Sequence, residues 1–355
     1  MLLTVITPDK PSWMDFIGNF CFDIYHLPEY FVIETKRFGG EALAICIENG
    51  DNKLFLPFIK RSINLNKNPS VSIECFDAIS PYGYPCPLIN IQGKEAHQFL
   101  KESIPFIKKE LNRLGIISLF IRFHPILSDP YIFQGDGIIV QHGETVWCDL
   151  TKSEADLWNQ LRKGHKQDIK SLQNTGYTAF EDVEWDNLDK FIYLYHATMR
   201  RVSAEKPYYF DKEYFMSLKK LLEKRINLWF VKKETDIITG GIFFECNGIV
   251  QYHLSASNPD SKVPGTKLML YKVMQNARAL GNVVFHLGGG LGAGNDSLLY
   301  FKSGFSNLRK GFFTWRWIIN SKEYAAHIED WQRCSGIEAD DIKGYFPAYR
   351  KEVPK

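Results

Sequence analysis

The stretch NARALGNVVFHLGGGLGAGNDSLLYFKSGF, residues 276–305, contains the clearest local pattern in this chain of 355 residues. It begins as the end of a helix, which Gly281 stops, and continues as an apolar β-type run over residues 283–287. Three glycines follow, and glycine tolerates positive φ and lets a ligand approach the backbone closely. A short helix then ends at Gly304. This order of strand, glycine loop and helix predicts a ligand-binding edge of a sheet.

A second copy of the pattern lies in the first half of the chain. Residues 111–124, LNRLGIISLFIRFH, repeat the order of residues 276–289, NARALGNVVFHLGG: a helix end, Leu-Gly and an apolar strand. Hairpin signals precede each copy, with Asn-Gly turns at residues 49–50 and 247–248. The economical interpretation is two copies of one α/β unit.

Hydrophobic periodicity and turn residues predict the remaining elements. In the first half we expect strands over residues 31–38, 42–48, 54–59 and 117–123 and a helix over 97–114. Between the copies we expect helices over residues 153–174, 188–202 and 214–224. In the second half we expect strands over residues 228–232, 241–246, 249–255, 283–287 and 312–319 and helices over 266–280 and 323–333.

A short polar connection at residues 141–149 is the expected boundary between the copies. It gives an N-terminal domain of residues 1–144 and a C-terminal, catalytic domain of residues 145–355. The length also favours two domains, because a single domain usually has about 100–200 residues. We therefore expect an α/β fold with mixed sheets, built from two tandem units with a helical segment between them.

Composition excludes several classes of protein. Hydrophobic residues make up 45% of the chain and charged residues 24%, so the chain is not of the disordered class. Forty-three basic and 41 acidic side chains leave a net charge of +2, which argues against a dedicated nucleic-acid binder and against DNA as a partner.

The seven cysteines are an odd number and include no CxxC pair, so neither a disulfide framework nor a zinc site is indicated. We expect buried thiols in a reducing compartment and no bound metal. The first residues, MLLTVITPDKPSW, lack a charged lead before a long apolar run, and no run of about 18 apolar residues occurs. A cytoplasmic protein without a membrane span is expected.

A strand, a loop and a helix follow one another over residues 249–280. Unpaired N–H groups and the dipole make the N-terminus of such a helix suitable for a phosphate group. The loop between Ser257 and Thr266 is therefore a candidate phosphate site, although an ordinary loop with a helix cap would give the same pattern.

Two segments resemble the GNAT superfamily of acyltransferases. Residues 261–266, SKVPGT, resemble its pyrophosphate-binding segment, with Lys262, Gly265 and Thr266 at the ligand-facing end and only one of the usual glycines. Tyr300, four residues before Gly304-Phe305, has the spacing of the tyrosine that protonates the leaving thiolate of coenzyme A in that superfamily. A core aromatic on a short helix is the alternative.

A more specific resemblance is to the Fem-like branch, two-domain acyltransferases that include aminoacyl-tRNA-dependent builders of peptidoglycan cross-bridges. Four segments carry it: DAISPYGYPCP (77–87), IRFHPIL (121–127), FIYLYHATMRR (191–201) and LLYFKSGFS (298–306). The resemblance implies two GNAT folds.

The same resemblance implies roles for individual residues. Lys302 would stabilise the oxyanion that develops on the reacting carbonyl, with Phe301 beside it. Arg201 would bind the diphosphate of a nucleotide-linked acceptor, and Tyr209 and Tyr82 would be further acceptor contacts. A solvated lysine, and an arginine paired with an acidic neighbour on its helix, are the alternatives. The basic run at residues 162–170 fits an anionic substrate or a tRNA, or a solvated face.

A general base would keep the attacking amine neutral. His253 is the first candidate, and Glu245 and His286 are others. A lone histidine on a strand is more often structural, and Fem-like enzymes need not use a protein base.

The expected reaction is transfer of an acyl group, such as acetyl, from acyl-CoA to an amino group of a nucleotide-linked amino sugar or another cell-envelope precursor. An aminoacyl-tRNA is the alternative donor. The tRNA-dependent enzymes of this family carry a long coiled-coil arm, and this chain has no heptad run of that length, which favours acyl-CoA. A binding module that has lost its donor site is the non-enzymatic alternative.

Overall fold

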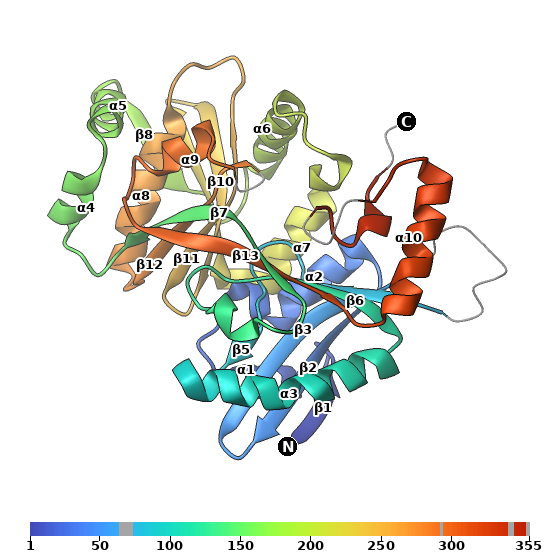
Figure 1. The fold of residues 1–355 in the computed structure, drawn as a ribbon. Coiled ribbons are helices and arrows are strands. Elements are labelled where there is room, and N and C mark those ends of the chain that lie inside the picture. Colours follow the sequence, from blue (N-terminus) through green and yellow to red (C-terminus); the bar gives the residue numbers. More distant parts are fainter. Residues whose placement is uncertain (64–73, 292–293, 340–343, 353–355) are drawn as a thin grey trace. The chain divides into compact units, whose positions relative to one another are not determined.

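The computed structural model (Figure 1) describes residues 1–63, 74–291, 294–339 and 344–352.

Two compact units make up the chain. The first contains Met1–His142 and Phe312–Lys355, and the second contains Gly143–Gly311. The chain passes between the units within two strands, β7 (Ile138–Asp149) and β13 (Arg309–Ile318). The C-terminal segment is therefore packed with the first unit. The sequential division at residues 144 and 145 remains a prediction about the domains.

The first unit is built on strands in the order β1-β2-β3-β4-β6-β13, with β5 paired to β3. β4 and β6 are parallel and α3 lies between them in the chain, while the other pairs are antiparallel. The strands are β1 (Leu2–Ile6), β2 (Glu41–Asn49), β3 (Asn52–Ser62), β4 (Phe76–Ile79), β5 (Leu88–Ile89) and β6 (Ile116–Arg122). The helices are α1 (Ser12–Ile17), α2 (Pro28–Phe38), α3 (Gly93–Arg113) and α10 (Ser321–Ser335), with short 3-10 helices at η1 (Ile24–His26), η2 (Pro130–Phe133) and η6 (Ala348–Arg350).

The expected strand at residues 31–38 is wrong, because this segment belongs to helix α2. Pro28 begins the helix, a position where its fixed φ is suitable and no N–H is needed. Tyr30, Ile33 and Glu34 are buried, and their i, i+3, i+4 spacing brings them to one side of a helix but not to one side of a strand. Packing overrides the strand preference of the local residues.

The second unit has the strand order β7-β12-β11-β10-β9-β8. β11 and β12 are parallel and α8 connects them, whereas β8, β9, β10 and β11 pair antiparallel in succession. The strands are β8 (Tyr177–Glu181), β9 (Ile226–Lys233), β10 (Asp236–Cys246), β11 (Ile249–Ser257) and β12 (Val284–Gly288). The helices are α4 (Glu154–Gln160), α5 (Lys163–Asn174), α6 (Leu188–Arg201), α7 (Lys212–Leu222), α8 (Gly265–Ala279) and α9 (Ser297–Lys302), with η3 (Lys206–Tyr208) and η4 (Glu223–Arg225).

Helices cover both faces of the sheet in the second unit, and Figure 1 shows α8 and α6 on opposite sides of it. Successive residues of a strand face opposite sides, so Trp229 and Val231 join the core under α4, α5 and α8, while Phe230 contacts Phe191 of α6. Two glycines in β10 allow the close approach. A Cβ at Gly240 would lie 2.7 Å from Phe230, and one at Gly241 would lie 2.7 Å from the Met269 side chain of α8. The hydrophobic core around α8 also contains Leu157, Leu172, Leu268, Phe285 and Phe305.

The α/β class with mixed sheets is confirmed. In the described parts of the chain, no helix combines the length and the apolar character needed to cross a membrane. Five of the seven thiols are buried, but Cys21 and Cys334 are exposed, which corrects the expectation of buried thiols for these two.

Candidate active site

The parallel strands β11 and β12 part after a short paired region. Their register ends with Gln251 opposite His286. β11 continues to Ser257, whereas β12 ends at Gly288, which pairs only with β7 on the other edge of β12. Backbone groups of the parted strands cannot bond to one another there, so a ligand can take their place. We call this place, beyond Gln251 and His286, the fork.

Lys302 reaches the fork from helix α9. Its Nζ donates a hydrogen bond of 2.6 Å to the carbonyl oxygen of Gly289, directly after β12. The same Nζ lies 5.6 Å from the ring centroid of Tyr252, the first residue of β11 beyond the paired region. Lys302 is only 8% exposed, and burial lowers its pKa from the usual 10.5 to about 8, against the opposing charge of Asp296. At neutral pH this gives an ammonium group held in a dry place.

Asp296 fixes the glycine segment to the start of α9. One carboxylate oxygen accepts from the N–H of Leu299 at 2.9 Å, which caps the helix. The other accepts from the N–H of Leu291 at 2.8 Å. From the sequence we also predict that residues 288–294 form a wall of the acceptor cleft, and residues 292–293 of this segment lie outside the described residues.

The Gly-Phe end of α9 packs against α5. Phe305 is fully buried, and its ring centroid lies 4.8 Å from that of His165. His165 Nε2 lies 3.0 Å from the carbonyl oxygen of Phe301. A Cβ at Gly304 would come within 2.3 Å of the same imidazole. Glycine is therefore needed at this position so that α9 and Lys302 keep their place.

Three predicted donor-site residues meet at the N-terminus of α8. Ser257 Oγ lies 3.1 Å from Thr266 Oγ1 and 3.3 Å from Thr239 Oγ1 of β10. Gly265 starts the helix against β10, where a Cβ would lie 2.6 Å from Thr239 Oγ1. Lys262 is exposed on the preceding loop. Hydroxyl groups at the positive end of a helix dipole suit an anionic oxygen, although the N–H groups of Gly265 and Lys267 already donate to the carbonyl oxygens of Val263 and Pro264.

Helix α6 adds side chains next to the loop at residues 258–266, which we call the donor loop. The N–H of Ser257 donates a hydrogen bond of 3.4 Å to Thr198 Oγ1 of α6. Arg201 follows Thr198 about one helical turn later. Arg201 is exposed at the end of α6. Tyr209 is half-buried, with its ring centroid 5.8 Å from that of His196. The structure thus places Arg201 near the donor loop, and its role in acceptor binding stays a prediction.

The base candidates have the surroundings of structural residues. His253 is 9% exposed, and its ring stacks on Phe244 with centroids 4.1 Å apart. Glu245 accepts a 2.8 Å hydrogen bond from Asn282 Nδ2, and its register partner Val250 places it near the hairpin turn, away from Ser257. A role as general base remains a prediction for either residue.

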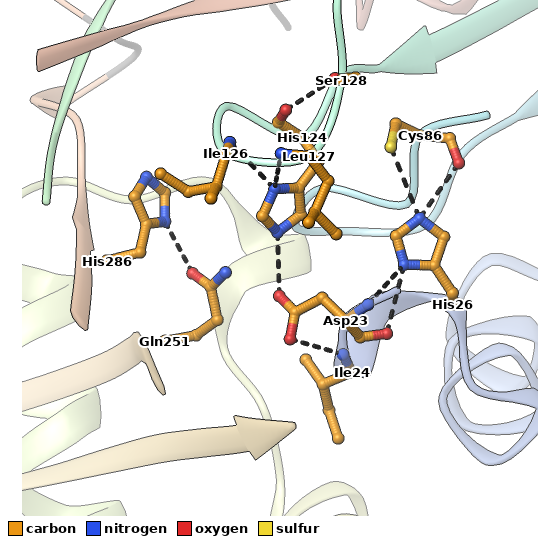
Figure 2. Close-up of polar contacts among 10 residues, drawn as sticks. All are labelled: Asp23, Ile24, His26, Cys86, His124, Ile126, Leu127, Ser128, Gln251 and His286. Carbon is orange, nitrogen blue, oxygen red and sulfur yellow. Dashed lines mark hydrogen bonds and ion pairs between the residues drawn. The ribbon is translucent and has the colours of Figure 1, made fainter. Parts of the chain in front are cut away.

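His286, the third base candidate, lies beside Gln251 at the last pair of the β11–β12 ladder (Figure 2). His286 Nδ1 and Gln251 Oε1 are 2.7 Å apart, and each side chain is 1% exposed. This buried contact joins the two strands where they begin to part.

Tyr300 and Lys302 point to different sides of α9. Residues of an α-helix are about 100° apart, so positions two residues apart face nearly opposite directions. Tyr300 is 66% exposed, and the guanidinium carbon of Arg162 lies 3.8 Å from its ring centroid. Phe301 is half-buried, with its ring 5.5 Å from that of His165. The general-acid role of Tyr300 and the substrate role of Phe301 stay predictions.

Tyr82 belongs to the first unit, in the loop after β4. Its N–H donates to Glu34 Oε2 at 3.2 Å, and its carbonyl oxygen accepts from the hydroxyl of Tyr30 at 2.9 Å. The loop is thus held against α2, and acceptor binding by Tyr82 is still a prediction.

A fully buried polar cluster holds the neighbouring loops of the first unit (Figure 2). His124 Nε2 lies 2.9 Å from Asp23 Oδ2, and His26 Nε2 lies 3.1 Å from the carbonyl oxygen of Cys86 and 3.5 Å from its sulfur. Burial lowers the pKa of His26 to about 4 and raises the pKa of Cys86 to about 12. A thiol with so high a pKa is not a nucleophile at neutral pH, so the cluster is structural.

Thr239, Tyr252 and Thr198 lie at the site and were not among the predicted residues. Thr198 lies in the segment FIYLYHATMRR (191–201), which was a usable signal. Tyr252 has no motif of its own. Thr239 comes to Ser257 only through the β10–β11 register. Across the described residues, no group of three or more His, Cys, Asp or Glu side chains is placed to hold a metal ion.

Comparison with solved structures places this geometry in a known fold. FemX is similar with a TM-score of 0.66 and 15% identity, over 92% of this chain and 99% of FemX. The C-terminal domain of a putative lysylphosphatidylglycerol synthetase from Agrobacterium fabrum gives a TM-score of 0.53 with 13% identity, over 90% of this chain and 94% of that domain. L-PGS from Bacillus licheniformis gives 0.51 with 12% identity, over 88% and 93%. No family model and no curated protein sequence matches the chain.

The expected Fem-like fold, of mixed α/β class, is therefore confirmed. At these identities the similarity establishes the fold alone. The activity must be argued from the fork and its side chains.

Proposed function

We propose that the protein is an acyltransferase that forms an amide at the fork between β11 and β12. The observation that carries the proposal is Lys302, a buried lysine whose Nζ lies between the end of β12 and Tyr252 of β11. A fixed cation in a place without water stabilises negative charge far better than a solvated one. Such a group is suited to a carbonyl oxygen that becomes an oxyanion.

In the proposed reaction, the nitrogen of a neutral amine attacks the carbonyl carbon of a thioester. The electron pair of the C=O bond moves to oxygen, and the Lys302 ammonium donates a hydrogen bond to that oxyanion. When the carbonyl re-forms, the C–S bond breaks, the thiolate leaves and takes up a proton, and the nitrogen loses one. The products are an amide and a free thiol.

Acyl-CoA is the proposed donor. The hydroxyls of Ser257 and Thr266 offer hydrogen bonds to a diphosphate at the positive end of the α8 dipole, and Lys262 is exposed beside them. An amino sugar linked to a nucleotide, or another cell-envelope precursor, is the proposed acceptor, with Arg201 as its diphosphate contact. We expect the reaction to take place in the cytoplasm.

An aminoacyl-tRNA is the second candidate donor. The observation in its favour is the donor loop at residues 258–266, which keeps only one glycine for close approach of a diphosphate. An ester-linked aminoacyl group would use the same oxyanion site, so the role of Lys302 does not depend on the donor.

Replacement of Lys302 by alanine tests the proposal. We expect Lys302→Ala to lower turnover by about 10² or more, the effect of losing an oxyanion-hole donor, while thermal melting shows a folded protein. Lys224→Ala removes an exposed lysine of the same unit and should leave turnover unchanged. A rate in Lys302→Ala close to that of the unchanged protein would remove Lys302 from the chemistry.

A further inference from the structure

Arg162 and Tyr300 form a preorganised stack on the surface of the second unit. The Arg162 guanidinium carbon lies 3.8 Å from the Tyr300 ring centroid, and Tyr300 remains 66% exposed. The guanidinium thus covers one face of the Tyr300 ring, and the exposed surface of this side chain comes from the rest of the ring. Nη1 of Arg162 also donates to the Tyr300 carbonyl oxygen at 3.1 Å, and its backbone N–H donates to Gly304 at 2.8 Å. These contacts fix the stack before any ligand arrives.

Further cationic residues follow Arg162 in the chain. Lys163 is exposed and Lys166 half-buried in the first turn of α5, and Lys166 Nζ donates to the carbonyl oxygen of Asn159 at 3.2 Å. Lys267, in the first turn of α8, forms an ion pair with Asp168 of α5. The first turn of α8 therefore lies close to the middle of α5.

His165, in the first turn of α5, contacts the same part of α9, with its Nε2 3.0 Å from the carbonyl oxygen of Phe301. Burial lowers the pKa of His165, and the charges of Lys267 and Arg162 lower it further, whereas the Phe301 carbonyl and Asp168 raise it. A ligand with both a flat ring and phosphate groups fits such a place.

We propose that the Arg162–Tyr300 stack binds the adenine ring of the donor coenzyme A, with Lys163 and Lys166 near its 3′-phosphate. This inference rests on the proposed acyltransferase function and takes the place of the general-acid role expected for Tyr300, because one ring cannot lie beside both the adenine and the thioester sulfur. Adenine would stack on the open part of the Tyr300 ring, and the diphosphate would lie at the start of α8. The pantetheine arm would continue to Lys302 in the fork.

The opposite orientations of Tyr300 and Lys302 favour coenzyme A over a tRNA donor. In coenzyme A, a diphosphate and a long pantetheine arm separate the adenine from the thioester. In an aminoacyl-tRNA, the terminal ribose carries the acyl group directly, so its adenine must stay beside the reacting carbonyl. A ring platform on the far side of α9 from Lys302 matches the longer ligand.

Direct binding of coenzyme A to the full chain, measured by titration calorimetry, tests the platform. Loss of stacking in Tyr300→Ala should weaken binding about 10-fold, while the conservative Tyr300→Phe restores the affinity. Phosphopantetheine lacks the adenosine, so Tyr300→Ala should bind it like the unchanged protein. Tyr193→Ala is the matched control, because Tyr193 is a 60% exposed tyrosine with Lys190 Nζ 5.8 Å from its ring centroid.

Three results would overturn the platform. Tyr300→Ala could bind coenzyme A unchanged, Tyr300→Phe could be as weak as Tyr300→Ala, or an RNA oligonucleotide ending in CCA could show the Tyr300 dependence in place of coenzyme A. Failure of the proposed function looks different. In that case Lys302→Ala would bind coenzyme A and transfer acyl groups at the normal rate, or the unchanged protein would bind neither ligand, which would overturn both proposals.

Discussion

Lys302 and Tyr300 acquire different chemistry although they lie two residues apart on one short helix. Lys302 is buried, and its amine donates a hydrogen bond to the Gly289 carbonyl. Tyr300 is largely exposed, and the Arg162 guanidinium stacks on its ring. A buried ammonium without water pays a desolvation cost, which is why its pKa falls. The same loss of water makes it a strong donor to a developing negative charge.

The pH dependence of turnover should report the protonation of Lys302. With a pKa of about 8, the side chain is an ammonium below that pH and loses its proton as the pH rises through it. Turnover limited by oxyanion stabilisation should therefore fall above about pH 8, after any rise caused by deprotonation of the acceptor amine. Rates measured from about pH 6 to pH 10 would show this falling limb.

Lys302→Arg provides the control, because a guanidinium keeps its charge throughout this pH range. Whatever the size of its turnover, the falling limb should disappear or move to higher pH. A limb with the same midpoint in Lys302→Arg would assign the titration to another group.

The sequence was sufficient to choose the residues of the motif LLYFKSGFS (298–306), but not to predict which way their side chains point. Spacing identifies Tyr300, Lys302 and Gly304, and helical geometry requires that Tyr300 and Lys302 face different ways. Which one is buried depends on the packing of Phe305 and His165, which are far apart in the sequence. Because lysine is usually exposed, residue type alone would give the opposite assignment.

At the scale of elements, a glycine determines how α9 meets α5. The His165 ring occupies the space that a side chain at Gly304 would need, at 2.3 Å. The imidazole is itself held by the Phe301 carbonyl and by Phe305, so it cannot move without disturbing α9.

Gly304→Ala should therefore displace α9 and with it Lys302. We expect a loss of stability of about 1–3 kcal/mol, as for an overpacked core, together with reduced turnover. The measurements are chemical denaturation and the transfer rate. Gly164→Ala is the matched change in α5, where a Cβ would meet nothing within 4 Å, and it should be neutral or stabilising by up to about 1 kcal/mol. Equal stability of the two variants would refute the packing account of the motif.

Most elements of the second unit follow from local periodicity, but the register at the donor site does not. A regular hairpin about the turn at residues 247–248 would place Ile238 opposite Ser257. A bulge between Ile242 and Phe243 shifts the pairing, so Thr239 takes that position and its hydroxyl reaches the donor loop. A bulge of one residue leaves no clear mark in hydrophobic alternation, so the sequence could not reveal it.

At the scale of the whole molecule, the repeat seen in the sequence corresponds to two β-α-β segments. In the first unit, α3 connects the parallel strands β4 and β6, and in the second, α8 connects β11 and β12. Local patterns were sufficient to find the second segment, and the helix and second strand of the first, but the expected strands did not include β4. Among the lysines that the structure describes, only Lys302 is buried, so duplication of the fold did not duplicate the candidate chemistry.

The position of the C-terminal segment could not be read from the sequence. Arg350 Nε donates to Asp77 at 2.7 Å, and Asp77 also accepts from Arg61 at 2.8 Å. The hydroxyls of Tyr349 and Ser118 lie 2.8 Å apart. The Arg350–Asp77 and Tyr349–Ser118 pairs join residues more than 200 positions apart, and a single sequence contains no periodic signal for them.

The central claim is that acyl transfer takes place at the fork beside Lys302. The most direct test is a crystal structure of the full chain with coenzyme A bound. The account predicts electron density for the pantetheine arm between β11 and β12, with the diphosphate at Ser257–Thr266 and the sulfur within reach of the Lys302 amine. Well-defined coenzyme A bound elsewhere, with the fork and Lys302 unchanged, would contradict it.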